Sequence, residues 1–323
     1  MGGVGLALVA GCGRWPGQAP ARPWRLGFLA PAAANQPETM AQYAALWAGL
    51  RELGYIEGEN LVVEYRYAGG QDERLPTLAG ELAQLKVDLI VAAGPGAAKA
   101  AKDATTTIPV VVPTSNAPVE TGLVASLARP GGNVTGLSLM APMLGSKRLD
   151  LLSQVLPGLA HVGVLVNPVE VAVDLDWAEV QRGAEALGVR LQRVDAPRLE
   201  SFGGAFEAFA RDHAEALLVL PGPLFSRERT RIVELAALHG LPGIYEHRLF
   251  SVDGGLLAYG PNLVDNYRRA GKYVDKILKG ASPADLPVEQ PNLFDFAINL
   301  KTAQALGLTI PPHVLLQATE VIQ

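Results

Sequence analysis

From Arg25 onward, short apolar segments alternate with amphipathic segments of helical length. A strand is expected over 25–30. A helix over 39–53 follows, with apolar residues every three or four positions and Gly54 as a C-terminal cap. Short strands that alternate with such helices are typical of parallel βαβ units. The sequence therefore predicts an α/β fold with parallel sheets.

This alternation forms two series, which are separated by a turn sequence at 129–132. The first series is expected to contain strands over 25–30, 61–67, 88–93 and 109–113 and helices over 39–53, 74–85, 97–104 and 119–127. The second is expected to contain strands over 133–139, 161–166, 189–194, 216–220 and 243–245 and helices over 145–156, 175–187, 202–211 and 227–239. Strands over 255–259 and 293–298 and helices over 266–278 and 300–306 remain, and we expect them to cross between two lobes. A chain of 323 residues is long enough for two cores of roughly 100 to 150 residues each.

Composition and motifs exclude several classes of protein. The net charge is -5 and the 27 Lys and Arg residues are spread along the chain, so no basic face is expected for nucleic acid. The sequence contains no nucleophile elbow, zinc-binding helix motif or cysteine cluster. Its five histidines are dispersed, and only His247 falls on a predicted site rim. We therefore expect no catalytic residue, no metal and no cofactor.

The single cysteine, Cys12, excludes an intramolecular disulfide and needs another explanation. The segment LVAGC at 8–12 resembles a bacterial lipobox, in which cleavage before the cysteine is followed by its acylation. The Pro- and Gly-rich stretch over 13–23 would then be a tether. No Lys or Arg precedes Cys12, which a start site assigned too far downstream would explain. The alternative is an apolar terminus with an incidental cysteine.

Ligands of open parallel sheets bind beyond the carboxyl ends of the strands, where helix N-termini face a crevice. This rule selects loops in both series. In the first series it selects 31–37, 94–96 and 113–116, and in the second 167–168, 221–223, 245–247 and 259–262. Two such rims that face each other would form a cleft.

Each candidate in these loops has a plain structural alternative. Thr114, Ser115 and Asn116 are also suited to capping a helix, and the glycines at 94 and 96 to a tight turn. Tyr245 and Tyr259 end apolar runs, so they are either ligand platforms or aromatics at the edge of the core. Glu246 and Asp265 could hold a cationic group, or they could be solvated carboxylates.

Three stretches of sequence together resemble one protein family. They are LGYIEGENL at 53–61, GLVASLARPGGNVTG at 122–136, and LPVEQP at 286–291 with NLKTA at 299–303 and GLTIPP at 307–312. The resemblance is to the ABC-transporter substrate-binding proteins with a type I periplasmic-binding fold, the group that includes tryptophan- and tyrosine-import components. It covers nearly all of the chain from Arg25 to Gln323.

The resemblance implies two Rossmann-like lobes joined by three crossover strands, and a hinge motion that traps a solute. We expect a leader and tether over 1–23, lobe 1 over 24–135 and about 262–285, and lobe 2 over 136–261 and about 286–323. The family's ligand-contacting loops correspond to the turn with Ala33 and Asn35 and to Gly96, Ala97, Thr114, Ser115, Asn167, Pro221, Tyr245 and Tyr259. The chain departs from relatives that carry an acid before the proline of the loop after the fourth strand, because Ala117 precedes Pro118 here.

We therefore expect an extracytoplasmic, lipid-anchored and monomeric solute-binding component of an ABC importer. Its expected partners are a small organic solute, either an amino acid or a related carboxylate, and the permease subunits in the membrane. Three other functions are weighed against this one. An exported receptor without a permease would use the same closure, and the effector domain of a transcriptional regulator would need a DNA-binding headpiece. An enzyme on the same scaffold would need a catalytic motif.

Overall fold

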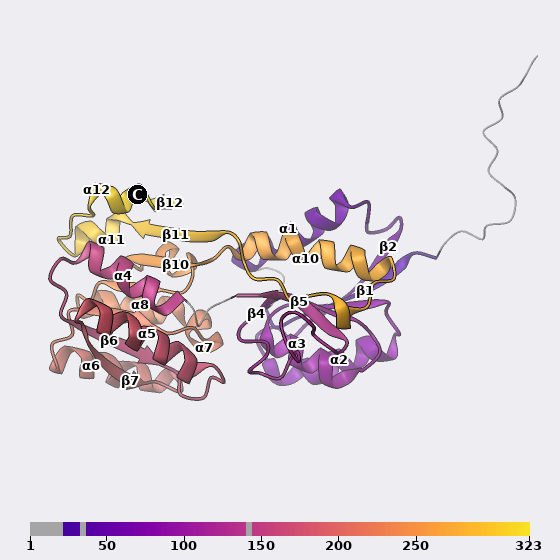
Figure 1. Cartoon of the computed structure of the whole chain (residues 1–323), viewed down its shortest axis with the longest axis horizontal. Helices are drawn as coiled ribbons and strands as arrows, with labels where there is room; N and C mark the ends of the chain where they lie inside the picture. Colours follow the sequence, from indigo (N-terminus) through magenta and orange to yellow (C-terminus); the bar gives the residue numbers. More distant parts are fainter. Residues whose placement is uncertain (1–21, 33–36, 140–143) are drawn as a thin grey trace, which may run out of the picture.

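The computed structural model describes residues 22–32, 37–139 and 144–323, which form two lobes side by side (Figure 1). Lobe 1 is built on a five-stranded sheet and lobe 2 on a seven-stranded sheet. The predicted α/β fold is confirmed. Cys12, Ala33 and Asn35 lie outside the described residues.

The sheet of lobe 1 is parallel, with strand order β2-β1-β3-β4-β5. Its strands are β1 Trp24–Ala30, β2 Leu61–Tyr67, β3 Leu89–Ala92, β4 Val110–Ser115 and β5 Val134–Ser138. Helices α2 (Leu75–Gln84) and α3 (Pro95–Ala104) cover one face, and α1 (Pro37–Glu52) and α10 (Leu263–Leu278) cover the other. Because both faces are covered, the central strands β3 and β4 are apolar for most of their length, and β4 becomes polar only at its end.

The sheet of lobe 2 has the order β12-β11-β10-β9-β8-β6-β7, and only the β10–β11 pair is antiparallel within it. Its strands are β6 His161–Val166, β7 Arg190–Asp195, β8 Ala216–Val219, β9 Gly243–Tyr245, β10 Leu257–Pro261, β11 Phe294–Asn299 and β12 Glu320–Ile322. One face packs on α4 (Gly145–Val155), α5 (Val173–Leu187), α11 (Leu300–Ala305) and α12 (Pro312–Leu315). The other packs on α6 (Phe202–Arg211), α7 (Pro223–Arg227), α8 (Arg229–Leu238) and α9 (Leu249–Val252).

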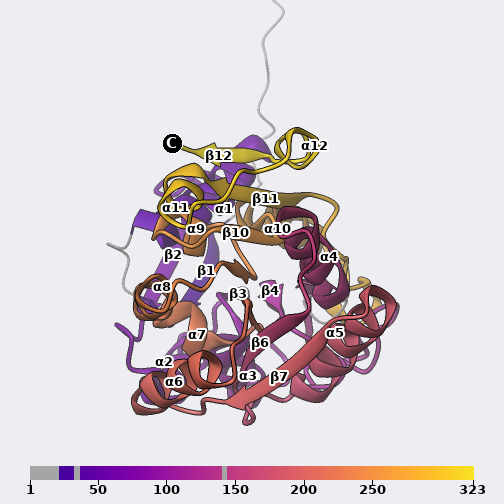
Figure 2. The same ribbon diagram turned by 90° about the vertical axis from the view of Figure 1, so that its left-hand side faces the viewer.

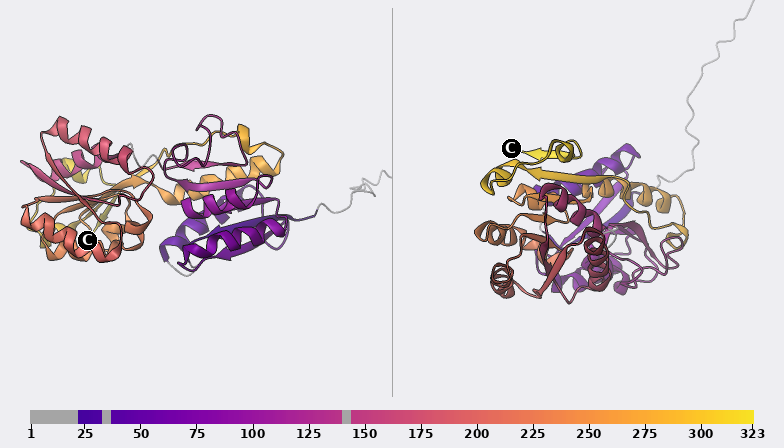
Figure 3. Two further views of the ribbon diagram at one scale, coloured as in Figure 1. Left: turned by 90° about the horizontal axis from the view of Figure 1, so that it is seen from below. Right: turned by 60° about the vertical axis from the view of Figure 1, so that its left-hand side comes forward.

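The chain passes between the lobes three times, from β5 to α4, from β10 to α10 and from α10 to β11. Figure 2 looks along the long axis of the molecule, and Figure 3 shows the two lobes from below. The last passage runs along lobe 1 first, where the N–H of Glu289 donates to the carbonyl of Gly136 and Val288 joins the core. Lobe 1 is therefore completed by residues that are distant in sequence.

Two sequence-based expectations for lobe 1 are wrong. The helix expected over 119–127 is a series of turns, because Gly122 adopts a left-handed φ of 67° and ends the first turn, after which Leu123 and Val124 enter the core. The strand expected over 133–139 does not open the second sheet. It is β5, which pairs with β4, and the expected boundary between residues 135 and 136 falls inside it.

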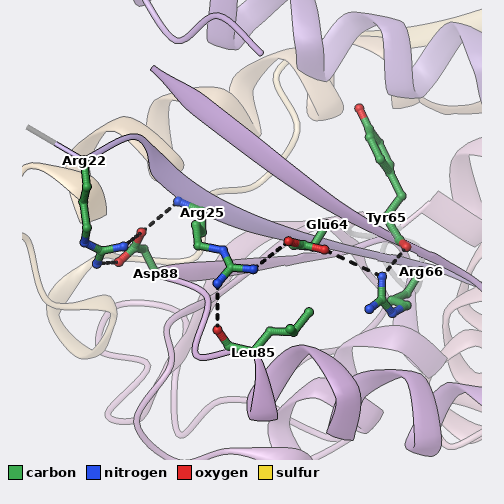
Figure 4. Close-up of polar contacts among 7 residues, drawn as sticks. All are labelled: Arg22, Arg25, Glu64, Tyr65, Arg66, Leu85 and Asp88. Atoms are coloured by element: carbon green, nitrogen blue, oxygen red, sulfur yellow. Dashed lines mark hydrogen bonds and ion pairs between the residues drawn. The ribbon is translucent and has the colours of Figure 1, made fainter. Parts of the chain in front are cut away.

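A network of charged side chains closes the end of the lobe 1 sheet where its strands begin (Figure 4). The carboxylate of Asp88 accepts hydrogen bonds from the backbone N–H of Arg25 at 2.8 Å and from the guanidinium of Arg22. Arg25 also donates to Glu64 on β2 at 2.7 Å. Polar groups at this end are therefore used for structure, and the opposite ends of the strands face the other lobe.

Helices α1 and α10 approach closely where Gly49 faces the backbone of α10. A Cβ at Gly49 would lie 2.6 Å from the carbonyl oxygen of Arg268. We predict that Gly49→Ala lowers the free energy of unfolding by about 1 to 3 kcal/mol, because the two helices must move apart. Gly80→Ala is the control, since a Cβ there meets nothing within 4 Å on α2 and should stabilise by about 0.5 to 1 kcal/mol. Urea unfolding measures both, and equal effects of the two substitutions would contradict the close contact.

Candidate functional site

A cavity of about 410 Å³ lies between the lobes and is lined by residues of both. Volumes of about 300 to 1,000 Å³ are usual for small-molecule sites. Lobe 1 contributes the N-terminal part of α3, the end of β4 and the turns after it, and lobe 2 contributes the loops after β6 and β8 and the start of α5. The cavity therefore lies at the carboxyl ends of parallel strands in both lobes, where ligands of such sheets bind.

The lobe 1 wall presents hydrogen-bond donors. Helix α3 begins with Pro95 after Gly94, no side chain caps it, and Gly96 lines the cavity. The first N–H groups of a helix have no partner within the helix and carry partial positive charge, which suits an anion. Ser115 and Asn116 lie beside this helix end and line the same cavity, and the Ser115 hydroxyl can donate a hydrogen bond. This wall can bind a carboxylate.

The β4 strand reaches this wall because its pairing with β5 shifts register between Val112 and Ser115. Gly136 of β5 lies against Val112, and a Cβ there would come within 2.0 Å of the Val112 carbonyl oxygen. Only glycine fits such a close approach at a positive φ. The end of β4 is thereby aimed at the cavity.

The lobe 2 wall contains charges that are buried. Arg148 on α4 is only 1% exposed, and its Nε donates to the carbonyl of Tyr259 at 2.8 Å, while one terminal nitrogen has no partner among the described residues. Asp176 on α5 is 5% exposed and lines the cavity, as does Glu170. Asp176, Glu170 and Glu246 interact electrostatically with one another or with Arg148. Asp176 and Glu246 therefore share one buried guanidinium, and Glu170 adds a further negative charge near both carboxyl groups.

Burial determines the protonation of these groups. It raises the pKa of Asp176 to about 7, against the opposing effect of Arg148. Burial also raises the pKa of Glu246 and of Glu170, although hydrogen bonds from Ser226 and Asn167 respectively oppose the rise. The cost of ionising a desolvated carboxyl is the physical cause in each case.

A second cavity, of about 260 Å³, adjoins the same arginine. Glu246, Ser226 and His247 line it, and the Ser226 hydroxyl donates to the Glu246 carboxylate. Burial and nearby arginines lower the pKa of His247 to about 3, so its ring is neutral at physiological pH. Asn116 and Pro95 line both cavities, which are therefore neighbouring parts of one cleft.

The structure brings together part of the predicted site. Gly96, Ser115 and Pro221 line the larger cavity, and Glu246 lines the smaller one. Three predicted residues are buried behind the walls: Ala97, Thr114, which shares a hydrogen bond with Tyr267, and Asn167, which donates to Glu170 at 2.9 Å.

Three other predicted residues point elsewhere. Tyr245 is a core residue, with its ring stacked on Phe250 at 4.7 Å. Tyr259 stacks on Phe294 and contributes its backbone carbonyl, which accepts from Arg148. Asp265 lies in the first turn of α10, where its carboxylate is 3.8 Å from Arg269. None of these side chains is among those that line the two cavities.

Sequence reasoning overlooked Arg148, Glu170 and Asp176. A signal was available for two of them, because each occupies a position in the apolar stripe of its helix. Arg148 lies four residues from both Leu144 and Leu152. Asp176 lies between Val173 and Val180 at spacings of three and four. A charged residue in a buried helical register is a candidate for function, because an unpaired charge there is costly.

Among the described residues, no group of three or more His, Cys, Asp and Glu side chains is arranged to hold a metal ion. None of the helices in the described ranges has the length and hydropathy of a membrane span.

Asp176 predicts a pH-dependent stability of the ligand-free protein. The unfolded carboxyl loses its proton near pH 4 and the native one near pH 7, so stability falls as the pH rises between these values. We expect Asp176→Asn to remove this fall and to raise the free energy of unfolding at pH 8 by about 2 to 4 kcal/mol. Urea unfolding at pH 5 and pH 8 tests this. The exposed Asp174→Asn in the same helical turn is the control, and parallel profiles for wild type and Asp176→Asn would rule the effect out.

Curated relatives and solved structures share this architecture. The chain is 26% identical over 259 residues to a tyrosine-binding protein of Clostridioides difficile, which covers 80% of this chain and 74% of that protein. An ABC domain from Streptococcus pneumonia solved in complex with L-Trp has a TM-score of 0.85 at 26% identity, covering 93% of this chain and 100% of that one. A conserved domain protein from Vibrio cholerae has a TM-score of 0.84 at 27% identity, with the same coverage.

The family model described as ABC transporter substrate binding protein matches residues 33–322. This range includes every described strand except β1, the three passages between the lobes and every residue that lines the cleft cavities. With two α/β lobes around an interlobe cavity, the chain belongs to the ABC transporter substrate-binding protein family.

Proposed function

We propose that this protein is the extracytoplasmic solute-binding component of an ABC importer and that it captures an amino acid in the interlobe cleft. The observation that carries this proposal is the cavity of about 410 Å³ whose two walls belong to different lobes and differ in charge. A solute in this cavity would contact both lobes at once. Its binding would therefore stabilise the closed arrangement.

The chemistry of the walls favours an amino acid. The free N–H groups of α3 and the Ser115 hydroxyl suit a carboxylate, and Leu123, Val171 and Pro223 provide apolar surface for a side chain. The relatives named for tyrosine and solved with L-Trp support the same class of ligand. An amino acid with an apolar or aromatic side chain is the ligand we propose.

Hinge closure would use the three passages between the lobes. An ion pair already joins the two lobes, where Arg227 on α7 of lobe 2 lies 3.8 Å from the carboxylate of Asp72 in lobe 1. Both side chains are about half exposed, so this pair is weak by itself and screened by salt. It would bias the lobes toward closure, while the ligand provides most of the energy.

The closed form is proposed to dock on the permease subunits of the transporter, with the protein as a monomer held at the membrane through Cys12. Figure 1 supports a tethered arrangement, because β1 begins at the outer end of lobe 1, away from lobe 2. A tether that enters there would leave the cleft unobstructed.

Solute binding is tested by calorimetry and thermal unfolding with a panel of amino acids and small carboxylates. We expect one amino acid to bind one to one and to stabilise the protein by about 3 kcal/mol at a concentration one hundred times its Kd. If no member of the panel binds, and mass spectrometry finds no solute that copurifies with the protein, the proposed function fails.

The pair of Asp72 and Arg227 is tested by exchanging its charges. We expect Asp72→Arg and Arg227→Asp each to weaken solute affinity by about two- to fivefold at low salt, and the double exchange to restore it. Arg231→Asp is the control, since Arg231 is an equally exposed cation on lobe 2 that pairs within its own helix. Failure of the double exchange to restore affinity would show that the pair does not act between the lobes.

A further inference from the structure

Asp176 is a buried carboxylate without a matching donor. It is 5% exposed and lines the cleft cavity, and its carboxylate accepts no hydrogen bond from any described residue. The opposite charge that acts on Asp176 is that of Arg148, which also interacts electrostatically with Glu246. A desolvated carboxylate without hydrogen bonds costs free energy. A ligand with a hydrogen-bond donor or a positive charge at this cavity wall would offset that cost.

The charges around Asp176 leave the lobe 2 wall negative. Glu170 lines the same cavity, and Glu246 lines the neighbouring one, whereas Arg148 is the cation among the described residues that offsets Asp176 electrostatically. Arg229, the other nearby arginine, is engaged by Asp253 at 3.0 Å. The ring of His247 is neutral. The wall therefore attracts a cation.

The lobe 1 wall offers no comparable acid. Ala117 stands before the proline of the loop after β4, and it is buried. Asp103 lines the cavity, but it is exposed and paired with Lys99 at 2.6 Å. The donors of α3 and Ser115 belong to lobe 1, and the unpaired acid belongs to lobe 2.

We propose that Asp176, with Glu170 beside it, forms the subsite for the ammonium group of the solute, so that the ligand spans the cleft with its carboxylate on lobe 1 and its ammonium on lobe 2. This inference rests on the proposed function and deepens it. It assigns the polarity of the bound solute and makes a protonated amine a condition of tight binding.

A consequence of this arrangement is proton release on binding. Asp176 faces Arg148 from α4, Glu170 from the loop after β6 and Glu246 from the loop after β9. An ammonium group adds a positive charge to this set and allows Asp176 to ionise, so binding below pH 7 must displace its proton. Affinity should therefore fall by about tenfold per pH unit below pH 7.

The experiment compares amino acids with their des-amino analogues by calorimetry on the full chain. The pairs are L-tryptophan with indole-3-propanoic acid, L-tyrosine with 3-(4-hydroxyphenyl)propanoic acid, and L-leucine with 4-methylpentanoic acid. We expect wild type to prefer the amino acid of at least one pair by about 100-fold. Asp176→Asn should lose about 30-fold or more in affinity for that amino acid, keep its affinity for the analogue, and lose the pH dependence.

Asp174→Asn is the matched control, because it removes an exposed carboxylate from the same turn of α5. It should bind like wild type. Thermal unfolding shows whether the Asp176→Asn variant is folded. If the folded variant keeps both the amino-acid preference and the pH profile of wild type, the ammonium subsite is wrong, and the proposed function stands. If wild type binds the acids with and without the amine equally, the subsite is again wrong. If wild type binds none of the six compounds, the proposed capture of an amino acid with an apolar or aromatic side chain is wrong.

Discussion

Helices cover both faces of each sheet in this protein. The central strands are therefore buried on both sides, which limits the positions where polar side chains can meet water or a ligand. The central strands β3, β4, β6 and β8 are apolar for most of their length because neither face meets water. Polar groups are therefore confined to the strand ends. In lobe 1 the starting end is occupied by the network around Asp88, which leaves the carboxyl end for a ligand.

The buried charges of lobe 2 are the main exception to this apolar interior. Removing Arg148 from water is costly, and its partners only partly offset that cost, since one of its nitrogens lacks a hydrogen bond among the described residues. Such an arrangement contributes little to stability by itself. Arg148 lines one of the two cleft cavities, so a charged solute bound in the proposed way would add contacts to this group of charges.

The connections between the lobes link this chemistry to motion. Helix α10 follows a strand of lobe 2 and packs on lobe 1 against α1, and the segment after it adds Val288 to the core of lobe 1. Each lobe therefore has a complete core of its own, as the proposed hinge closure requires, with the three passages as its hinge. The weak pair of Asp72 and Arg227 is a further contact between the two lobes.

The sequence by itself determined the α/β class, most of the strands and helices, and the family resemblance, because periodicity and turn residues act over short distances. Gly96, Ser115, Pro221 and Glu246, which the sequence places in the rim loops, line the cavities, and their contact with a ligand stays a prediction. Only the tertiary structure decided that β5 joins lobe 1, that Tyr245 turns into the core, and that Arg148, Glu170 and Asp176 meet at one wall. These outcomes depend on contacts between segments far apart in the chain, which no local pattern encodes.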